Sequence, residues 1–308
     1  MVNVESADPA SVTEQVRAFY GSLPFNVEDG VGRAASTVRA VNQIARAYGP
    51  LDGELRANPS ASVLDVGCGA GRFVNTVAFH YGASVTGVDL CEPALRRAAA
   101  VASALRIESR ARFVAANLFH LGRSLGADAR FAVVNSLGVL HHTADCRGAL
   151  AAIAPFVAPA GLLHLGLYHR HGRRPFLELF EPFRRRLRDA STDAERRRIE
   201  DDAVREYGRL HQGLTDETLV RSWCRDQVFH PHETQHTLQE AVGWLEEVGL
   251  QPWLTSINRF ERVADWAGLY KLEPSLAELS YQRNVREGRY YPGFFIVLAR
   301  RPAESSTR

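Results

Sequence analysis

The stretch VLDVGCGAGRF, residues 63–73, decides the fold class of this chain. Its first half is a short apolar run, which predicts a buried strand that ends at Asp65. Three glycines follow at alternate positions, and GRFVNTVAFHYG then has the spacing of a helix. Glycines at such a turn let the backbone approach a ligand, and the following helix offers free N–H groups to an anion. A tight turn without a ligand is the alternative interpretation.

The glycine spacing favours one class of nucleotide ligand over another. Dinucleotide-binding proteins usually have Gly-x-Gly-x-x-Gly, whereas Gly67, Gly69 and Gly71 here form Gly-x-Gly-x-Gly. The next strand ends at Asp89, about twenty residues on, where a carboxylate can accept both hydroxyls of a ribose. The third strand ends at Asn117, whose amide is placed to face an adenine. A nicotinamide-dependent oxidoreductase is therefore disfavoured.

Strands and helices alternate along the central part of the chain. The segments ASVLDVG, ASVTGVDL, ARFVAANL, FAVVNSLG and GLLHLGLYH read as strands separated by helices, and LQPWLTSI and GFFIVLARR as two later strands. This alternation indicates βαβ units and a parallel sheet with helices on both faces. The predicted fold class is α/β, with a doubly wound, seven-stranded and mostly parallel sheet.

Residues 63–168 resemble the class I S-adenosylmethionine-dependent methyltransferases. VLDVGCGAGRF resembles the nucleotide-binding loop of that family, VTGVDL its ribose-binding strand end, FVAANL the strand beside adenine and NSLGVLHHT the segment after the fourth strand. The resemblance implies an antiparallel last strand and S-adenosyl-L-methionine as the cofactor. It implies a cofactor site made of Tyr20, Asp65, Gly67, Cys68, Gly69, Gly71, Asp89, Leu90, Asn117, Leu118 and Asn135.

The same resemblance divides these residues by the part of the cofactor they would hold. The three glycines would hold its methionine part, Asp89 its ribose, and Asn117 with Leu118 its adenine. The family more often has aspartate at the position of Asn117, but an amide carbonyl can also accept from the adenine amino group. Asn135 would reach the aminocarboxylate end. Tyr20, in the N-terminal segment FYGSLPFN, would close over the methionine side or else only pin that segment to the core.

The pattern of apolar and charged residues along the sequence divides the chain into four parts. A charged, helix-prone stretch without strands follows the fifth strand, and it is too long for a plain loop. We expect it to form a helical lid over the acceptor. The predicted parts are an N-terminal helical cap at 1–50, the cofactor-binding core at 51–169, the lid insertion at 170–236, and the rest of the core sheet at 237–308 with a second insertion at 258–291. Within the cap, helices are expected around Ser11–Tyr20 and 32–48.

Methyl transfer needs a base only if the acceptor still carries its proton. Ligands bind at the carboxyl ends of strands in open α/β sheets, which makes His142 after the fourth strand and Tyr168 at the end of the fifth candidate catalytic residues. Two further candidates, His230 and His232, lie in the stretch FHPHETQHT. Purely structural roles are the alternative for each of them.

The histidines of FHPHETQHT do not form a convincing metal site. His232 and His236 have a spacing of four, which would place two ligands on one helical face. However, residues 237–240 read as a capping box, so that the helix begins at Thr237 and all three histidines precede it. No metal is predicted.

Composition limits the partners and the cellular setting. The net charge is +2, from 37 basic and 35 acidic side chains, which does not favour nucleic acid. The four cysteines are scattered and no run of 18 apolar residues occurs, so a cytoplasmic protein without a membrane span is expected. Arg170, Arg173 and Arg174 would suit an acceptor that bears a carboxylate or phosphate. The oligomeric state stays open, with an oligomer among the alternatives.

The sequence thus predicts an enzyme that transfers a methyl group to oxygen, nitrogen or carbon of a small biosynthetic acceptor. Two alternatives remain. One is methylation of tRNA or another nucleic acid, although NSLG stands where many base-amino methylases have Asn/Asp-Pro-Pro-aromatic. The other is a partner protein that binds the cofactor without transferring its methyl group.

Overall fold

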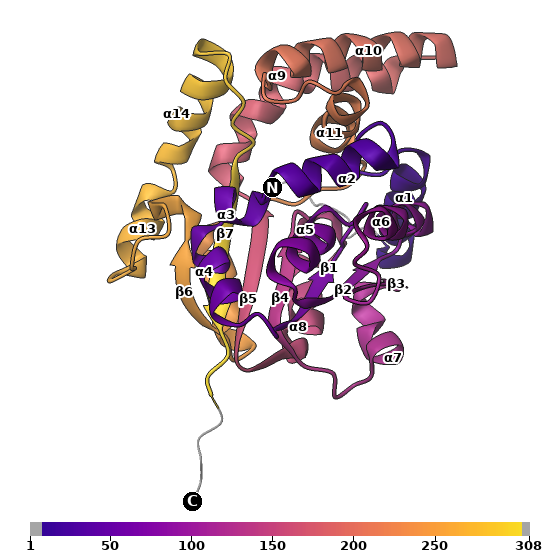
Figure 1. The fold of residues 1–308 in the computed structure, drawn as a ribbon. Coiled ribbons are helices and arrows are strands. Elements are labelled where there is room, and N and C mark those ends of the chain that lie inside the picture. Colours follow the sequence, from indigo (N-terminus) through magenta and orange to yellow (C-terminus); the bar gives the residue numbers. More distant parts are fainter. Residues whose placement is uncertain (1–7, 304–308) are drawn as a thin grey trace, which may run out of the picture.

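The computed structural model describes residues 8–303 of the 308-residue chain. Its centre is a seven-stranded sheet with the strand order β3-β2-β1-β4-β5-β7-β6 (Figure 1). The first five strands run parallel, and β7 is antiparallel to both β5 and β6. The predicted fold class is confirmed. The strands are β1 Ser62–Val66, β2 Ser84–Asp89, β3 Ala111–Ala115, β4 Phe131–Leu137, β5 Val157–Tyr168, β6 Gln251–Thr255 and β7 Phe294–Arg300.

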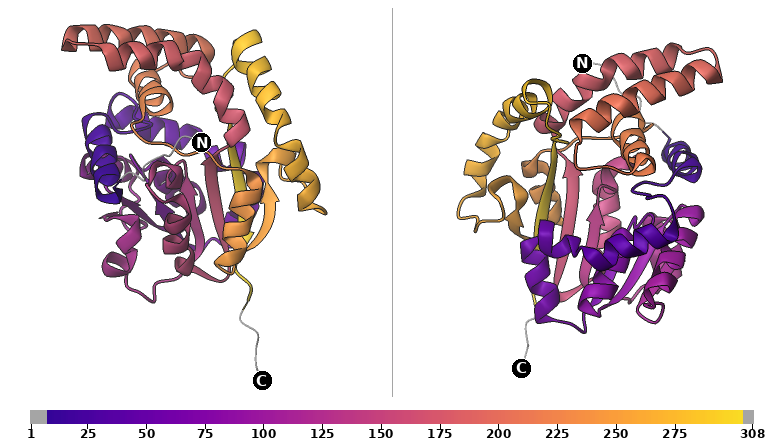
Figure 2. Two further views of the ribbon diagram at one scale, coloured as in Figure 1. Left: turned by 180° about the vertical axis from the view of Figure 1, so that it is seen from behind. Right: turned by 45° about the horizontal axis from the view of Figure 1, so that its top comes forward.

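Helices cover both faces of the sheet, and each face has its own apolar core (Figure 2). The middle strands are buried on both sides, which explains their near-continuous apolar sequence. One core contains side chains of α2 Val31–Ala40, α3 Gln43–Ala47, α4 Gly49–Ala57, α5 Arg72–Tyr81 and α6 Glu92–Leu105. The other contains side chains of α7 Leu121–Leu125, α8 Cys146–Ile153 and α12 Leu238–Glu247, and of the short helices η1 Leu118–His120, η2 Leu140–His142 and η3 Ala154–Phe156.

The N-terminal helices differ from the predicted ones. The first, α1, spans Pro9–Ser22 and so extends two residues beyond each end of the predicted helix. The single helix expected over 32–48 is broken, because α2 ends at Ala40 and α3 begins at Gln43. Asn42 causes this new start, since its side chain accepts hydrogen bonds from the backbone N–H groups of Ile44 and Ala45. The first N–H groups of a helix have no partner within the helix, and an asparagine at the N-cap accepts hydrogen bonds from them.

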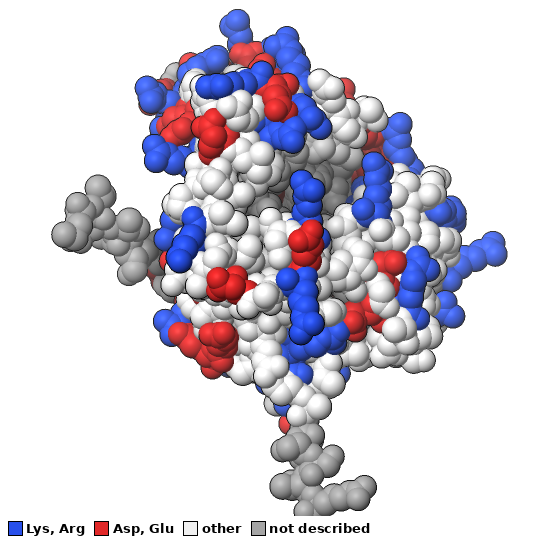
Figure 3. All heavy atoms as spheres, turned by 90° about the vertical axis from the view of Figure 1, so that its left-hand side faces the viewer, with Lys and Arg blue, Asp and Glu red and all other residues white. Residues whose placement is uncertain are grey.

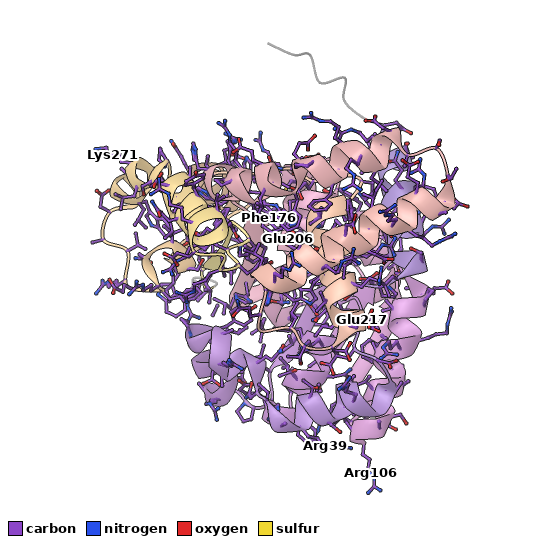
Figure 4. The ribbon with its side chains drawn as sticks, turned by 90° about the horizontal axis from the view of Figure 1, so that it is seen from above. Arg39, Arg106, Phe176, Glu206, Glu217 and Lys271 are labelled. Atoms are coloured by element: carbon purple, nitrogen blue, oxygen red, sulfur yellow. The ribbon has the colours of Figure 1, made fainter. Side chains whose placement is uncertain are left out.

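The stretch after the fifth strand forms three helices, α9 Arg170–Asp189, α10 Asp193–Leu210 and α11 Glu217–Phe229. They enclose a third apolar cluster that includes Phe176, Phe180 and Tyr207, all fully buried. Seen from above, α9 and α10 lie across this end of the molecule (Figure 4). Their many arginines lie mainly on the outer face, paired with acidic residues of the same helices. We call these three helices the lid.

The second insertion lies between β6 and β7. It contains η4 Ser256–Asn258, α13 Trp266–Leu272, α14 Ser275–Tyr281 and η5 Gln282–Arg286. Glu273, between α13 and α14, joins this insertion to the core, because its carboxylate accepts from His169 Nε2 (2.7 Å) and from the backbone N–H of Leu238 (2.6 Å). Leu238 opens α12, and the capping box predicted there is confirmed by the reciprocal bonds of Thr237 and Glu240. Lys271, the one lysine of the sequence, lies at the outer edge of this insertion (Figure 4).

Candidate active site

The glycine loop between β1 and α5 is shaped for close approach of a ligand. Gly67, Gly69 and Gly71 have φ of +74°, +51° and +76°, which other residues rarely adopt. A Cβ atom on Gly67 would overlap Val139, and one on Gly71 would overlap Ala98. At Gly69 a Cβ would meet nothing within 4 Å. Two glycines thus serve packing, and Gly69 borders open space that a ligand can fill.

A cavity lies beside this loop, between α1 and the carboxyl ends of β1, β2, β3 and β4; we call it the first cavity. Its floor is the edge of the sheet, and its roof includes Tyr20 and Phe25. Most residues predicted for the cofactor line it. They are Tyr20, Gly67, Gly69, Asp89, Leu90, Asn117 and Leu118.

Asp89 ties the ends of two strands together. Its Oδ2 accepts from the backbone N–H of Gly69 and its Oδ1 from that of Cys91, both at 2.8 Å. Burial raises the pKa of this carboxyl, and the backbone hydrogen bonds oppose the rise. The carboxylate is thereby fixed at the cavity wall with lone pairs remaining for a ribose.

The side-chain oxygen of Asn117 already has a hydrogen-bond partner within the chain. Its Oδ1 accepts from the backbone N–H of Phe119 (3.0 Å) and so caps the short helix η1. The amide nitrogen makes no hydrogen bond to any part of the chain that the structure describes. This nitrogen is therefore free to donate to an adenine ring. The sequence predicted instead that the amide oxygen accepts from the adenine amino group.

A second cavity opens on the other side of the glycine loop. It shares Phe25, Gly67, Gly69 and Leu137 with the first cavity, so the two meet at the loop. The predicted cofactor residues Asp65, Cys68 and Asn135 line it, while Gly71 lines neither cavity. Its outer wall comes from Leu219 and Trp223 of the lid helix α11 and from Leu214 in the loop between α10 and α11. Figure 3 shows one face of the molecule hollowed between the charged helical top and the core below.

Asp65 lies at the base of the second cavity. It is only 3% exposed, and burial raises the pKa of its carboxyl to about 7, against the effect of a hydrogen bond from Asn135 Nδ2 (2.7 Å). A carboxyl of this kind ionises readily when a cation lies beside it. The site therefore suits an ammonium group.

His142 reaches the first cavity from η2. Its Nδ1 lies 2.9 Å from the backbone carbonyl oxygen of His232, which can only accept, so Nδ1 carries the proton. Its Nε2 is buried and has no partner among residues 8–303. Burial lowers the pKa of His142 from the ordinary value of 6.5. The ring is thus a neutral imidazole with a free lone pair.

The other predicted catalytic residues line neither cavity. Tyr168 is 2% exposed, and its oxygen accepts from Gln227 Nε2 (2.6 Å). His230 stacks on His142, with ring centroids 3.7 Å apart, and its Nδ1 accepts from the N–H of His232. His232 Nε2 lies 3.1 Å from the carbonyl oxygen of Thr143. These residues surround His142, and catalytic roles for them remain predictions.

The sequence did not predict a partly buried hydrogen bond between Tyr20, which lines the first cavity, and the lid. The Tyr20 hydroxyl donates to Asp226 Oδ1 (2.5 Å), which joins α1 to the lid helix α11. Asp226 is 4% exposed, and burial raises its pKa. The two residues lie 206 positions apart, so no local pattern connects them.

The three arginines expected near an anionic acceptor lie elsewhere. Arg170 and Arg174 pair with Glu240 and Glu178 at the surface. Arg173 has a fully buried side chain that pairs with Glu233 (2.8 Å), and its guanidinium lies 3.8 Å from the centre of the Tyr168 ring. None lines either cavity, so they do not support an anionic acceptor.

Among residues 8–303, no group of three or more histidine, cysteine, aspartate or glutamate side chains is arranged to hold a metal ion. Within the same range, no helix is both long and apolar enough to cross a membrane.

The sheet order, the glycine loop and the cavity beside it define a class I S-adenosylmethionine-dependent methyltransferase domain. In agreement, residues 63–161 match a family model described as a methyltransferase domain. The chain contains this domain, and the residues around the first cavity fit S-adenosylmethionine as its cosubstrate.

Particular relatives agree with this class. An uncharacterised protein of Synechococcus sp. is 27% identical over 260 residues, which are 80% of this chain and 60% of that protein. A ubiquinone biosynthesis O-methyltransferase of Rhizobium rhizogenes is 33% identical over 120 residues, 38% of this chain and 45% of that enzyme. The chain thus spans about half of these curated relatives. A solved putative sarcosine dimethylglycine methyltransferase from Galdieria sulphuraria has a TM-score of 0.50 at 11% identity, with 85% of each chain covered, and shares the fold.

Proposed function

We propose that the protein is an S-adenosylmethionine-dependent methyltransferase that acts on oxygen, nitrogen or carbon of a small molecule. The observation that carries this proposal is the state of His142. His142 lines the cofactor cavity and is a neutral imidazole with an unpartnered Nε2, which can accept a proton. A base at this place favours transfer of the methyl group over binding of the cofactor alone.

The reaction is an in-line displacement. When bound, S-adenosylmethionine supplies a methyl carbon already activated by a positively charged sulfur. The nucleophilic atom of the acceptor gains a bond to this carbon as the carbon–sulfur bond breaks, and its proton passes to His142 Nε2. S-adenosylhomocysteine leaves together with the methylated acceptor. The chain contributes mainly by holding the nucleophile at near-attack distance and excluding water, which Tyr20 and Phe25 assist from the roof.

The lining of the second cavity agrees with a small acceptor that has an apolar part. The apolar side chains of Phe25, Leu214, Leu219 and Trp223 line it, together with the charged side chains of Asp65, Arg46 and Arg72. The O-methyltransferase relative from Rhizobium rhizogenes also supports a small-molecule acceptor. The net charge of +2 gives a nucleic acid no general attraction.

The proposal is tested by incubating the full chain with S-adenosylmethionine and a panel of phenols, hydroxy acids, amines and activated-methylene compounds, and by measuring S-adenosylhomocysteine release. Release that depends on one acceptor class supports the proposal. Tight S-adenosylhomocysteine binding without release across the whole panel, and without release on tRNA, would favour a non-catalytic cofactor-binding protein.

A further inference from the structure

Three polar side chains form a line across the sheet beneath the second cavity. Asp65 of β1 pairs in register with Asn135 of β4, which pairs with His164 of β5. Register partners in parallel strands point to the same face. Their side chains are therefore adjacent, and all three are at most 3% exposed. We call this set the polar ladder.

In the polar ladder each residue donates toward Asp65: His164 donates to Asn135, and Asn135 donates to Asp65. Asn135 Nδ2 donates to Asp65 Oδ1 at 2.7 Å, because an amide NH₂ group can only donate. Asn135 Oδ1 then faces His164 Nδ1, also at 2.7 Å, and an amide oxygen can only accept. His164 therefore carries its proton on Nδ1. Its donation fixes the amide so that the NH₂ group is presented to Asp65.

Packing alone does not explain the polar ladder. The layer next to it on the same face is apolar, with Val63, Val133 and Leu162 in register. In contrast, His164 is fully buried, and its Nε2 has no partner within the described part of the chain. A buried polar atom without a partner costs about 1 to 3 kcal/mol. An apolar side chain would avoid this cost, as the neighbouring layer shows.

The acidic end of the polar ladder is the functional end. Asp65 lines the second cavity, which joins the first cavity at Gly67 and Gly69. The histidine end is closed instead, because the His164 ring packs edge-to-face on Tyr48 with centroids 5.0 Å apart. Any effect of His164 on a ligand must therefore pass through Asn135, which lines the second cavity and donates to Asp65.

We propose that His164 is a positioning residue for the cofactor: through Asn135 it holds Asp65 oriented and ionised to receive the ammonium group at the aminocarboxylate end. This inference rests on the proposed function. It assigns a role to a residue of the fifth strand that touches neither cavity.

The test measures S-adenosylhomocysteine affinity by calorimetry as a function of pH. His164→Phe keeps a ring against Tyr48 but removes the donor, and His164→Asn keeps an N–H close to the position of Nδ1. We expect His164→Phe to weaken binding about tenfold at pH 7 and to move the pH dependence of binding upward, because Asp65 ionises less readily without an oriented amide. His164→Asn should restore both. His80→Leu, which removes a histidine of α5 outside both cavities, is the matched control.

The pH readout is specific to Asp65. The other ionisable side chains around it are Asp89 at the end of β2, Cys68 in the glycine loop, and Tyr48, Arg46 and Arg72 at the second cavity. None of them changes among these variants. A merely structural histidine would alter the unfolding temperature without moving the pH dependence.

A second measurement needs no variant. Nitrogen-15 NMR of the wild-type imidazoles should show His164 protonated on Nδ1, with a shift that responds to S-adenosylhomocysteine. The Nε2-protonated form, or a His164→Phe variant with wild-type affinity and pH dependence, would overturn the positioning role. Absence of S-adenosylhomocysteine binding to the wild type would instead overturn the proposed function.

Discussion

At the scale of single residues, the proposed chemistry depends on the tautomer of His142. The carbonyl of His232 fixes the proton of His142 on Nδ1, and burial keeps the ring neutral. The sequence identified His142 as a candidate base from its place after the fourth strand. It could not assign the tautomer, because the partner carbonyl lies 90 positions away.

Replacing His142 with glutamine should lower turnover about 10²- to 10⁴-fold, the usual contribution of a general base. Affinity for S-adenosylhomocysteine should change by less than about threefold, because the cofactor itself needs no base. Because the pKa of His142 is lowered, the acid limb of the wild-type rate profile should lie below pH 6.5. His120→Gln, at an exposed position outside both cavities, is the control. Equal turnover of His142→Gln and wild type would remove His142 from the mechanism.

The raised pKa of Asp65 leads us to expect that cofactor binding depends on pH. Its pKa is raised to about 7, so below this pH the free protein holds a proton there that an ammonium ligand must displace. Affinity for S-adenosylhomocysteine should therefore rise with pH up to about 7 and then level off, with a slope approaching tenfold per unit on the acid side. Calorimetry in two buffers of different ionisation enthalpy should record proton release below pH 7. A flat profile between pH 5.5 and 8 would contradict an ionised Asp65 in the site.

The glycines of the loop should respond differently to alanine. Gly67→Ala combines positive φ with overlap on Val139, and should destabilise the fold by at least about 1 to 3 kcal/mol. Gly69→Ala carries only the backbone cost, because its Cβ would enter open space. It should lose cofactor affinity out of proportion to its stability. Chemical denaturation and calorimetry of both variants separate the two effects, and a Gly69→Ala protein with normal affinity would place the ligand elsewhere.

At the scale of elements, the first cavity is closed by contacts between parts far apart in sequence. Local signals found the capping box of α12, because its two residues are three positions apart. They missed the break between α2 and α3, where Asn42 caps a new helix inside an apparently continuous pattern. They also missed the link from α1 to α11, which depends on how the lid packs over the core.

Tyr20→Phe tests that link. The variant loses the hydrogen bond to the buried Asp226 carboxyl, and we expect a stability loss of about 1.5 to 3 kcal/mol, as for hydrogen bonds to charged groups. Cleavage within α1 by a protease should become faster, because the helix is held less firmly to the lid. Tyr281→Phe, at an exposed position of α14, should have no effect on either measurement. Unchanged unfolding and proteolysis of Tyr20→Phe would show that the contact does not hold α1 in place.

At the scale of the whole molecule, the sequence predicted the class of sheet, and most of the residues predicted for the cofactor line one cavity. Strand ends are marked locally by glycines and acids, and the α/β architecture brings those ends to one edge. The division into two cavities was not predictable, because it depends on where the lid and α1 settle. The arginines were misplaced for a related reason: composition indicates charge, whereas packing decides that Arg173 is buried against Glu233.

Calorimetric titration of the full chain with S-adenosylhomocysteine, with NAD as the comparison, tests directly whether the two cavities bind this cofactor. We predict saturable binding of one molecule per chain, and a rise of the unfolding temperature that grows with ligand concentration, as binding to the native state requires. NAD should produce neither effect. Failure of millimolar S-adenosylhomocysteine to bind or to stabilise the protein would contradict the assignment of both cavities.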